Sequence, residues 1–195
     1  SAADFVRYAE YLTVHDAVQL VVAPDCARSG GSFCDALEER GDATSAPATV
    51  FVSYAAKHDV GAIVRALRTW SDSAPPSEAP HRFWLRATSL SQRDVAASAL
   101  PMNTAPWFAS FEAMLAQIGR TLPVLMPWRA PLSVGTVRGV FELYEAIRAG
   151  AEVTFVLPPR ARAEMEGAIA AEFNAVANAI AGGVALDGAR HVSRE

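Results

Sequence analysis

The stretch PWRAPLSVGTVRGVFELYEAIRAGAEVTFVLP, residues 127–158, decides the fold class of this chain. It begins with a proline-rich loop and continues at 135–149 with an amphipathic pattern that is typical of a helix. Gly150 follows at the position where a glycine commonly ends a helix, and the apolar residues 151–157 then predict a strand. A helix followed by a strand in this way predicts one unit of a parallel α/β sheet.

The same alternation recurs along the chain. We predict strands at 49–54, 81–88 and 121–126, and helices at 58–70, 107–118 (with Pro106 as the first helical residue) and 160–181. Pro123 favours an edge or end position for its residue in the third strand, because proline donates no hydrogen bond to a sheet. The fold class is therefore α/β, a flavodoxin-like open parallel sheet of four to five strands with helices on both faces.

Three segments make up the predicted domain organisation. Residues 1–48 form an N-terminal lead-in packed on the domain, with one helical patch, SFCDALEER, that Ser32 caps. Residues 49–183 form the α/β domain itself. Residues 184–195 form a flexible tail.

Composition excludes several classes of protein. Hydrophobic residues make up 51% of the 195 residues and charged ones 19%, which is typical of a globular domain. The net charge of −4 argues against a nucleic-acid partner. The longest apolar run is too short to cross a membrane, and the acidic N-terminal residues SAADFVRYAE are unlike a signal peptide.

Cysteine and histidine usage predicts neither disulfides nor a metal site. Cys26 and Cys34 form no CxxC motif, so we expect a reducing, cytoplasmic setting without disulfides. The four histidines show no metal-ligand spacing, so no metal is predicted, and each histidine is expected at the surface or at a helix end.

The helix at 135–149 carries the main candidate for chemistry, Glu142. Its apolar stripe consists of Val137, Val140, Phe141, Tyr144 and Ile147, and Arg138, Glu142 and Glu145 lie on a neighbouring stripe. One interpretation is a solvated charged face with a weak Arg138–Glu142 ion pair, where Glu142→Ala would change stability by no more than about 0.5 kcal/mol.

The other interpretation makes Glu142 a functional carboxylate. In a parallel sheet the ligand crevice lies at the carboxyl ends of the strands, where Ser53 and Tyr54 end the first strand and Trp128 follows the third. We therefore expect Ser53, Tyr54, Trp128 and Arg138 to line a crevice around Glu142. A guanidinium one helical turn away would lower the pKa of this carboxyl.

Five segments of the chain carry a resemblance to a known family. They are APATVFVSYAA (46–56), FWLRATSLSQ (83–92), LPVLMPWRAPL (122–132), FELYEAI (141–147) and GAEVTFVLP (150–158). In order and content they resemble the Toll/interleukin-receptor (TIR) domain, and more closely the TIR-like domains found with helical repeats in protists and algae. The similarity covers residues 21–158.

The resemblance implies both an activity and partners. TIR domains of this kind hydrolyse or cyclise NAD⁺ with one glutamate on the third helix, which matches Glu142 here. NAD⁺ is then a substrate, no cofactor or metal is needed, and nicotinamide leaves through an oxocarbenium-like transition state that a carboxylate stabilises. The implied setting is signal transduction and immunity in the cytoplasm, with a homo-oligomer or other TIR-like domains as partners and neither nucleic acid nor membrane.

Several residues depart from the family pattern. The tryptophan and cysteine that precede the glutamate are Arg138 and Gly139 here, and the aspartate of the second strand is Arg86. These changes remove an aromatic wall and add two guanidinium groups near Glu142. Two hypotheses therefore stand: an NAD⁺ nucleosidase that uses Glu142, or a catalytically degenerate TIR-like domain that serves as a protein-interaction scaffold.

Overall fold

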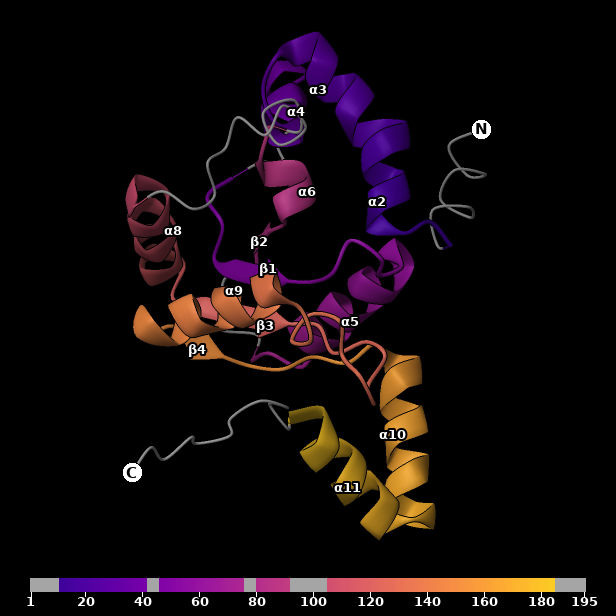
Figure 1. Cartoon of the computed structure of the whole chain (residues 1–195). Helices are drawn as coiled ribbons and strands as arrows, with labels where there is room; N and C mark the ends of the chain where they lie inside the picture. The colour runs from indigo at the N-terminus through magenta and orange to yellow at the C-terminus, as the bar shows by residue number, and fades with distance from the viewer. Residues whose placement is uncertain (1–10, 42–45, 76–79, 92–104, 185–195) are drawn as a thin grey trace, which may run out of the picture.

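A computed structural model describes residues 11–41, 46–75, 80–91 and 105–184 of the chain, and Figure 1 shows how its elements are arranged. The chain forms a four-stranded sheet with strand order β2-β1-β3-β4. The strands are β1 (Val50–Ser53), β2 (Phe83–Trp84), β3 (Arg120–Pro123) and β4 (Glu152–Val153). All three pairings are parallel, which confirms the predicted open, flavodoxin-like α/β class.

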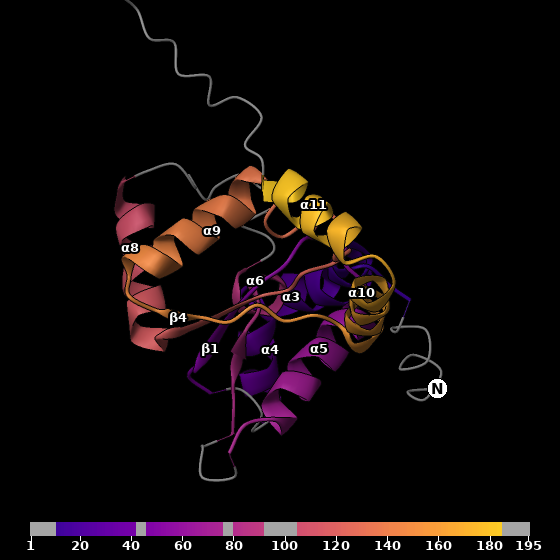
Figure 2. The same ribbon diagram turned by 90° about the horizontal axis from the view of Figure 1, so that it is seen from below.

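Helices cover both faces of this sheet. Helix α5 (Val60–Asp72) lies on one face, and α8 (Ala105–Ile118) and α9 (Val137–Arg148) lie on the other (Figure 2). Because successive side chains of a strand point to opposite faces, β1 contributes to two cores. Val50 and Val52 pack with α5, whereas Phe51 packs with Phe111 and other residues of α8 and α9.

The N-terminal lead-in forms helices that arch over one end of the sheet in Figure 1. They are α2 (Val14–Ala17), a π-helical turn η1 (Val18–Val22), α3 (Ala23–Ser29) and α4 (Phe33–Glu39). Ser32 caps α4, as predicted, because its hydroxyl accepts the N–H of Asp35 at 3.2 Å. The Val14 N–H donates to the His58 carbonyl at 2.9 Å, which ties this lead-in to the domain.

Two predicted strands are shorter than expected. The segment predicted as a strand at 81–88 is a strand only at β2 and then turns into helix α6 (Arg86–Ser89). The Ala87 N–H donates to the Tyr54 hydroxyl at 2.8 Å, and this side-chain partner takes the place of a neighbouring strand. The predicted strand at 151–157 pairs only over β4 and at an isolated bridge between Val124 and Val156.

The C-terminal region departs from the prediction of one helix at 160–181. It forms α10 (Pro159–Ala171) and α11 (Phe173–Val184), which are separated at Glu172, where φ is −148° and ψ is 68°. Of the two positions predicted for Pro123, the end of a strand is correct, because Pro123 is the last residue of β3. The edge position is not, because β3 is a central strand. The predicted tail beyond residue 184 lies outside the described residues. Over the described part of the chain, no helix has both the length and the apolar content needed to cross a membrane.

Candidate functional site

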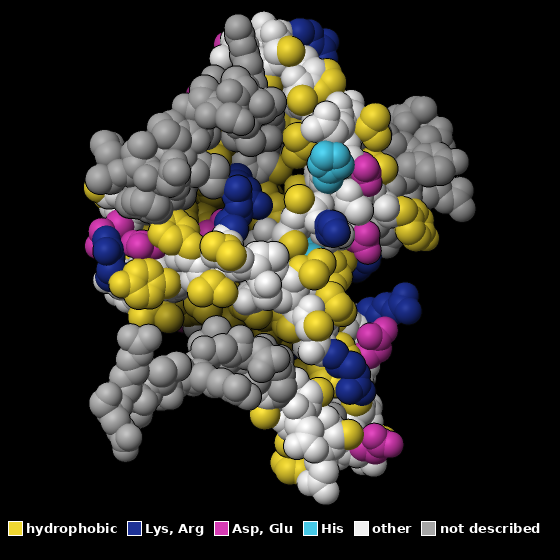
Figure 3. Space-filling view, viewed as in Figure 1, with side chains coloured by type: hydrophobic (Ala, Val, Ile, Leu, Met, Phe, Trp, Pro, Cys, Tyr) yellow, Lys and Arg dark blue, Asp and Glu magenta, His cyan; other side chains and the backbone are white. Residues whose placement is uncertain are grey.

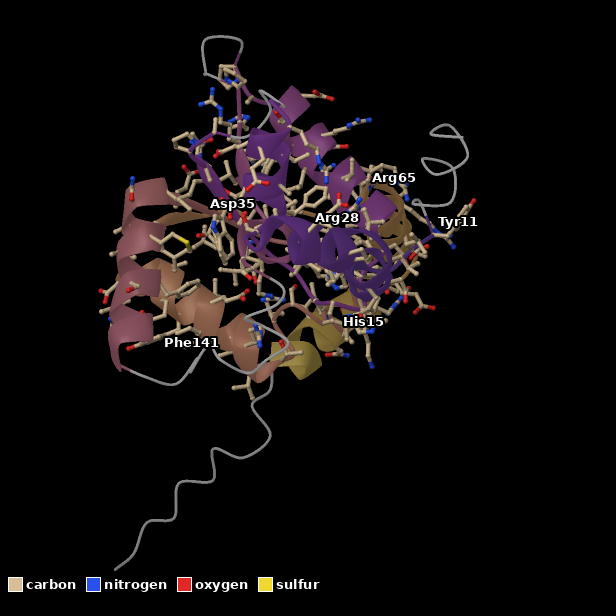
Figure 4. All side chains as sticks on the ribbon, turned by 90° about the horizontal axis from the view of Figure 1, so that it is seen from above. Tyr11, His15, Arg28, Asp35, Arg65 and Phe141 are labelled. Carbon is tan, nitrogen blue, oxygen red and sulfur yellow. The ribbon has the colours of Figure 1, made fainter. Side chains whose placement is uncertain are left out.

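Helix α9 has the opposite orientation to the one its apolar stripe suggests. Glu142 and Glu145 are buried, with 6% and 4% of their surface exposed. Val137, Val140, Tyr144 and Ile147 are exposed instead, and of the predicted stripe only Phe141 packs inward. The Phe141 ring stacks on Phe111 of α8 at 5.6 Å, and Figure 4 shows it on the α8 side of α9. The interpretation of Glu142 as part of a solvated charged face is therefore wrong.

Gly139 explains this orientation. A Cβ atom at this position would lie 1.3 Å from the carbonyl oxygen of Ser133, so only glycine allows α9 to approach the preceding loop so closely. The Ser133 hydroxyl in turn donates to the Val124 carbonyl, which fixes the loop to the end of β3. With Gly139 against this loop, Glu142 and Ala146 follow at i+3 and i+7 and face the sheet.

The Glu142 carboxylate is bound at the end of β1. The Ser53 hydroxyl donates to one of its oxygens at 2.6 Å, and the Arg86 guanidinium donates to the other at 2.7 Å. Burial raises the pKa of Glu142, and the charge of Arg86 and the bond from Ser53 only partly oppose this effect. Arg138 does lower the pKa of this carboxyl, as predicted, but its contribution is smaller than that of burial, so the pKa as a whole is raised.

Tyr54 holds Arg86 in place. The Arg86 guanidinium lies 5.4 Å from the centre of the Tyr54 ring and also donates to the Tyr54 carbonyl oxygen at 3.4 Å. Tyr54 itself is 5% exposed, and burial raises its pKa. Ser53, Tyr54, Arg86 and Glu142 thus form one connected polar cluster at the carboxyl ends of the strands.

A hollow of about 500 Å³ adjoins this cluster. Its walls come from the N-terminal helices, from the end of β1, from α6 and from the first turn of α9, and they include Tyr54, Arg86 and Arg138. Glu142 and Ser53 are not among the described residues that line it. Arg86 lines the hollow and also bonds to Glu142, so a guanidinium group stands between the solvent and the carboxylate.

Trp128 does not join the other predicted site residues. It lines a different hollow, together with Asp59, Arg65 and Arg160, and it packs under its neighbour Arg129, whose guanidinium lies 4.3 Å from the ring centre. Ser53, Tyr54 and Glu142 are brought together, and Arg138 is brought to the edge of the same region. Trp128 is absent from the described lining of the hollow beside Glu142.

His58 directly precedes Asp59, the N-cap of α5, so the predicted helix-end position is correct for this histidine, but the residue is not at the surface. It is 1% exposed, its Nε2–H donates to the Met126 carbonyl at 2.8 Å, and its Nδ1 accepts the Ala55 N–H at 3.4 Å. Burial lowers its pKa, so the ring is held neutral. Within the described ranges, no group of three or more metal-ligating side chains could hold a metal ion.

Arg86 was not predicted as a site residue. Its signal in the sequence was a departure from a family pattern, which placed a guanidinium near Glu142 but did not indicate that it would pair with the carboxylate. Only the turn into α6 at this residue brings the guanidinium over the end of β1. Comparisons with family models, with curated proteins and with solved structures found no match to this chain.

Proposed function

We propose that this chain is a TIR-like domain that acts by protein interaction, in the cytoplasm, and does not hydrolyse NAD⁺. The resemblance supports the TIR-like part of this proposal, and the cysteine usage supports the compartment. The orientation of α9 supports the other two parts, which are the interaction function and the absence of NAD⁺ hydrolysis. The same rotation that buries Glu142 against Ser53 and Arg86 exposes the apolar residues of the helix.

The bonds of Glu142 argue against the nucleosidase hypothesis. A carboxylate that stabilises an oxocarbenium ion must reach the ribose of the substrate. Glu142 is 6% exposed, and both of its oxygens accept bonds from other side chains. Releasing it would leave the Arg86 charge without its carboxylate in a partly buried place, and breaking a buried ion pair is costly.

The exposed residues of α9 favour an interaction surface. Val137, Val140, Tyr144 and Ile147 follow one another at intervals of three and four residues, which is the spacing of a helix seam that packs against another helix. Their exposed fractions lie between 54% and 91%. Figure 3 shows hydrophobic side chains gathered over α9 on the face in view. We propose a second copy of this domain, or another TIR-like domain, as the partner.

Two measurements on the same preparation test this proposal. Mass spectrometry of NAD⁺ incubated with concentrated protein should find no nicotinamide released. Sedimentation velocity should show association that Val140→Glu abolishes and that Val64→Glu preserves, because Val64 is an exposed valine of α5 on another face.

The outcomes separate the two hypotheses. Release of nicotinamide that Glu142→Gln abolishes would establish the nucleosidase and overturn the proposal. Association that both valine substitutions weaken equally, or that neither weakens, would remove α9 as the interaction surface.

A further inference from the structure

Helix α11 has an apolar face that the rest of its own copy leaves uncovered. Its sequence, FNAVANAIAGGV, includes no charged residue. None of its described side chains is buried, and Phe173 and Ile180 are more than half exposed. It packs mainly on α10, and Figure 1 shows these two helices, the α10–α11 arm, extending away from the sheet. An apolar helix that is exposed in this way indicates a surface for a partner.

The exposed residues of α11 match the exposed stripe of α9 in spacing and length. Phe173, Ala177 and Ile180 are all exposed and follow one another at intervals of four and three residues. The exposed apolar residues of α9 have the same intervals. Both helices have 12 residues, so each is about 18 Å long at a rise of 1.5 Å per residue. Two helices with such stripes can pack along their whole length, and the small Ala177 leaves room for a larger side chain of α9.

The two stripes do not cover each other within one copy. The arm begins with α10, which packs on α5, and α5 lies on the face of the sheet opposite to α9 (Figure 2). At Glu172 the chain then turns into α11, whose main contact is with α10. Because both stripes remain exposed in this arrangement, a second copy is the partner that can cover both of them at once.

A twofold pair of copies makes the contact between α9 and α11 twice. In each copy two aromatic side chains, Tyr144 and Phe173, and four aliphatic ones are more than half exposed and lie on these stripes. The aliphatic ones are Val137, Val140, Ile147 and Ile180. A specific interface buries more than about 1,000 Å² in total, and one aromatic side chain supplies about 150 to 250 Å² when it is fully buried. Making the contact twice doubles the buried area and brings it to this order of size.

The residues that flank the two stripes favour an antiparallel alignment. Glu172 is exposed and directly precedes Phe173, and Arg148 is exposed and directly follows Ile147. An antiparallel alignment places this carboxylate near this guanidinium and sets the helix dipoles against each other favourably. Arg148 already has ion pairs in its own copy, so the added attraction is small and apolar burial supplies most of the stability of the contact.

We propose that two copies of this chain dock their α10–α11 arms on each other, so that α11 of each copy lies antiparallel on the exposed stripe of α9 in the other. Such a pair has twofold symmetry, in which the same two surfaces meet in both directions. The inference rests on the proposed interaction function, and it names the part of the second copy that contacts α9.

Sedimentation velocity of the full chain tests whether α11 takes part. Wild-type protein should associate, and Phe173→Glu should weaken the association at least tenfold, as Val140→Glu should. Leu20→Glu is the matched control, because Leu20 lies on the N-terminal turn η1 and is exposed to a similar degree as Phe173. It should leave the association unchanged. Since all three positions are exposed, the variants should fold, and urea denaturation checks that they do.

A mixture of two variants tests which surfaces meet. Phe173→Glu keeps the α9 stripe intact, and Val140→Lys keeps the arm intact. A mixed pair retains one unaltered contact and sets the new glutamate against the new lysine in the other. The equimolar mixture should therefore associate at least tenfold more tightly than either variant alone. A mixture no tighter than its components would mean that α9 meets α9 and α11 meets α11, which would overturn the docking of arms.

The outcomes also distinguish this inference from the proposed function. Loss of association in Val140→Glu but not in Phe173→Glu would overturn the role of the arm and leave α9 as the interaction surface. Equal loss in Leu20→Glu and Phe173→Glu would overturn the role of the arm as well. Wild-type protein that stays monomeric at high concentration would overturn the inference together with self-association through α9.

Discussion

Helices α5 and α9 lie on opposite faces of the same sheet and have similar amphipathic patterns, yet they present opposite sides to it. Helix α5 buries Ile63 and Leu67 and exposes Arg65 and Arg68, as its pattern predicts. Helix α9 buries two glutamates and exposes four large apolar residues. The comparison shows that an amphipathic pattern defines two faces of a helix but does not decide which of them meets the core.

In α9, local contacts determine which face of the helix meets the core. Gly139 is the residue that lets the helix touch the Ser133 carbonyl, and Ser53 and Arg86 supply partners for the carboxylate that this contact turns inward. Helix α5 turns Ile63, Ala66 and Leu67 into the core, as burial of apolar area favours.

The largest expected effect is that of Gly139→Ala. The new methyl group would overlap the Ser133 carbonyl, so we expect a loss of about 3 kcal/mol or more in the free energy of unfolding. Gly167→Ala in α10 is the control, because the space around that glycine is open. It should stabilise the protein by about 0.5 to 1 kcal/mol. Urea denaturation measures both, and equal stability of the two variants would contradict the role of Gly139.

Glu142→Ala should lower the free energy of unfolding by about 3 kcal/mol, because it leaves Arg86 without its buried partner. The small effect on stability that we expected from the sequence assumed that Glu142 is solvated, and its burial replaces that expectation. Glu164→Ala is the control, since Glu164 also pairs with an arginine, Arg160, but at an exposed place. That change should cost no more than about 0.5 kcal/mol. A similarly small loss for Glu142→Ala would mean that the carboxylate faces solvent.

The loss of stability on replacing Ile63 or Ile147 by alanine compares the burial of the two helices directly. Ile63→Ala removes a buried side chain of α5 and should cost at least about 2 kcal/mol. Ile147→Ala removes a side chain of α9 that is 64% exposed, so its cost in dilute protein should stay within about 0.5 kcal/mol. Comparable losses in urea denaturation would show that both helices bury their apolar faces.

The smallest effect concerns pH and His58. Its pKa in the folded protein is lowered by burial, whereas the unfolded chain takes up the proton near the ordinary histidine pKa of 6.5. The contribution of His58 to stability should therefore be nearly constant well above pH 6.5 and decrease as the pH falls below it, by at most about 1.4 kcal/mol per pH unit. Stability curves of wild type and His58→Gln at pH 7.5 and 5.5 measure this. A slope that is unchanged in the variant would assign it to other groups.

The sequence allowed the fold class to be predicted because strands and helices have different periods. The first strand, α5 and the cap at Ser32 could be located from propensity and spacing alone. The cluster around Glu142 could be predicted only in part. Ser53 and Tyr54 were found from their place at a strand end, which is a property of topology.

The orientation of Glu142 could not be predicted in the same way. It depends on a contact between Gly139 and a backbone atom six residues earlier, and on a turn at Arg86 more than fifty residues away. Neither appears as a pattern in the local sequence. Trp128 illustrates the converse, because its place after a strand suggested a site residue, yet the loop directs it to another hollow.

Solvent access to two neighbouring residues of α9 tests the central claim most directly. Ala146 is fully buried and Ile147 is exposed, so single cysteines at these positions should differ sharply. In dilute Cys34→Ser protein, Ile147→Cys should react with a thiol reagent at nearly the rate of a free thiol. Ala146→Cys should react only as the protein unfolds. Fast reaction at 146 with protection at 147 would contradict the account, because α9 would then bury its apolar face and turn Glu142 toward solvent.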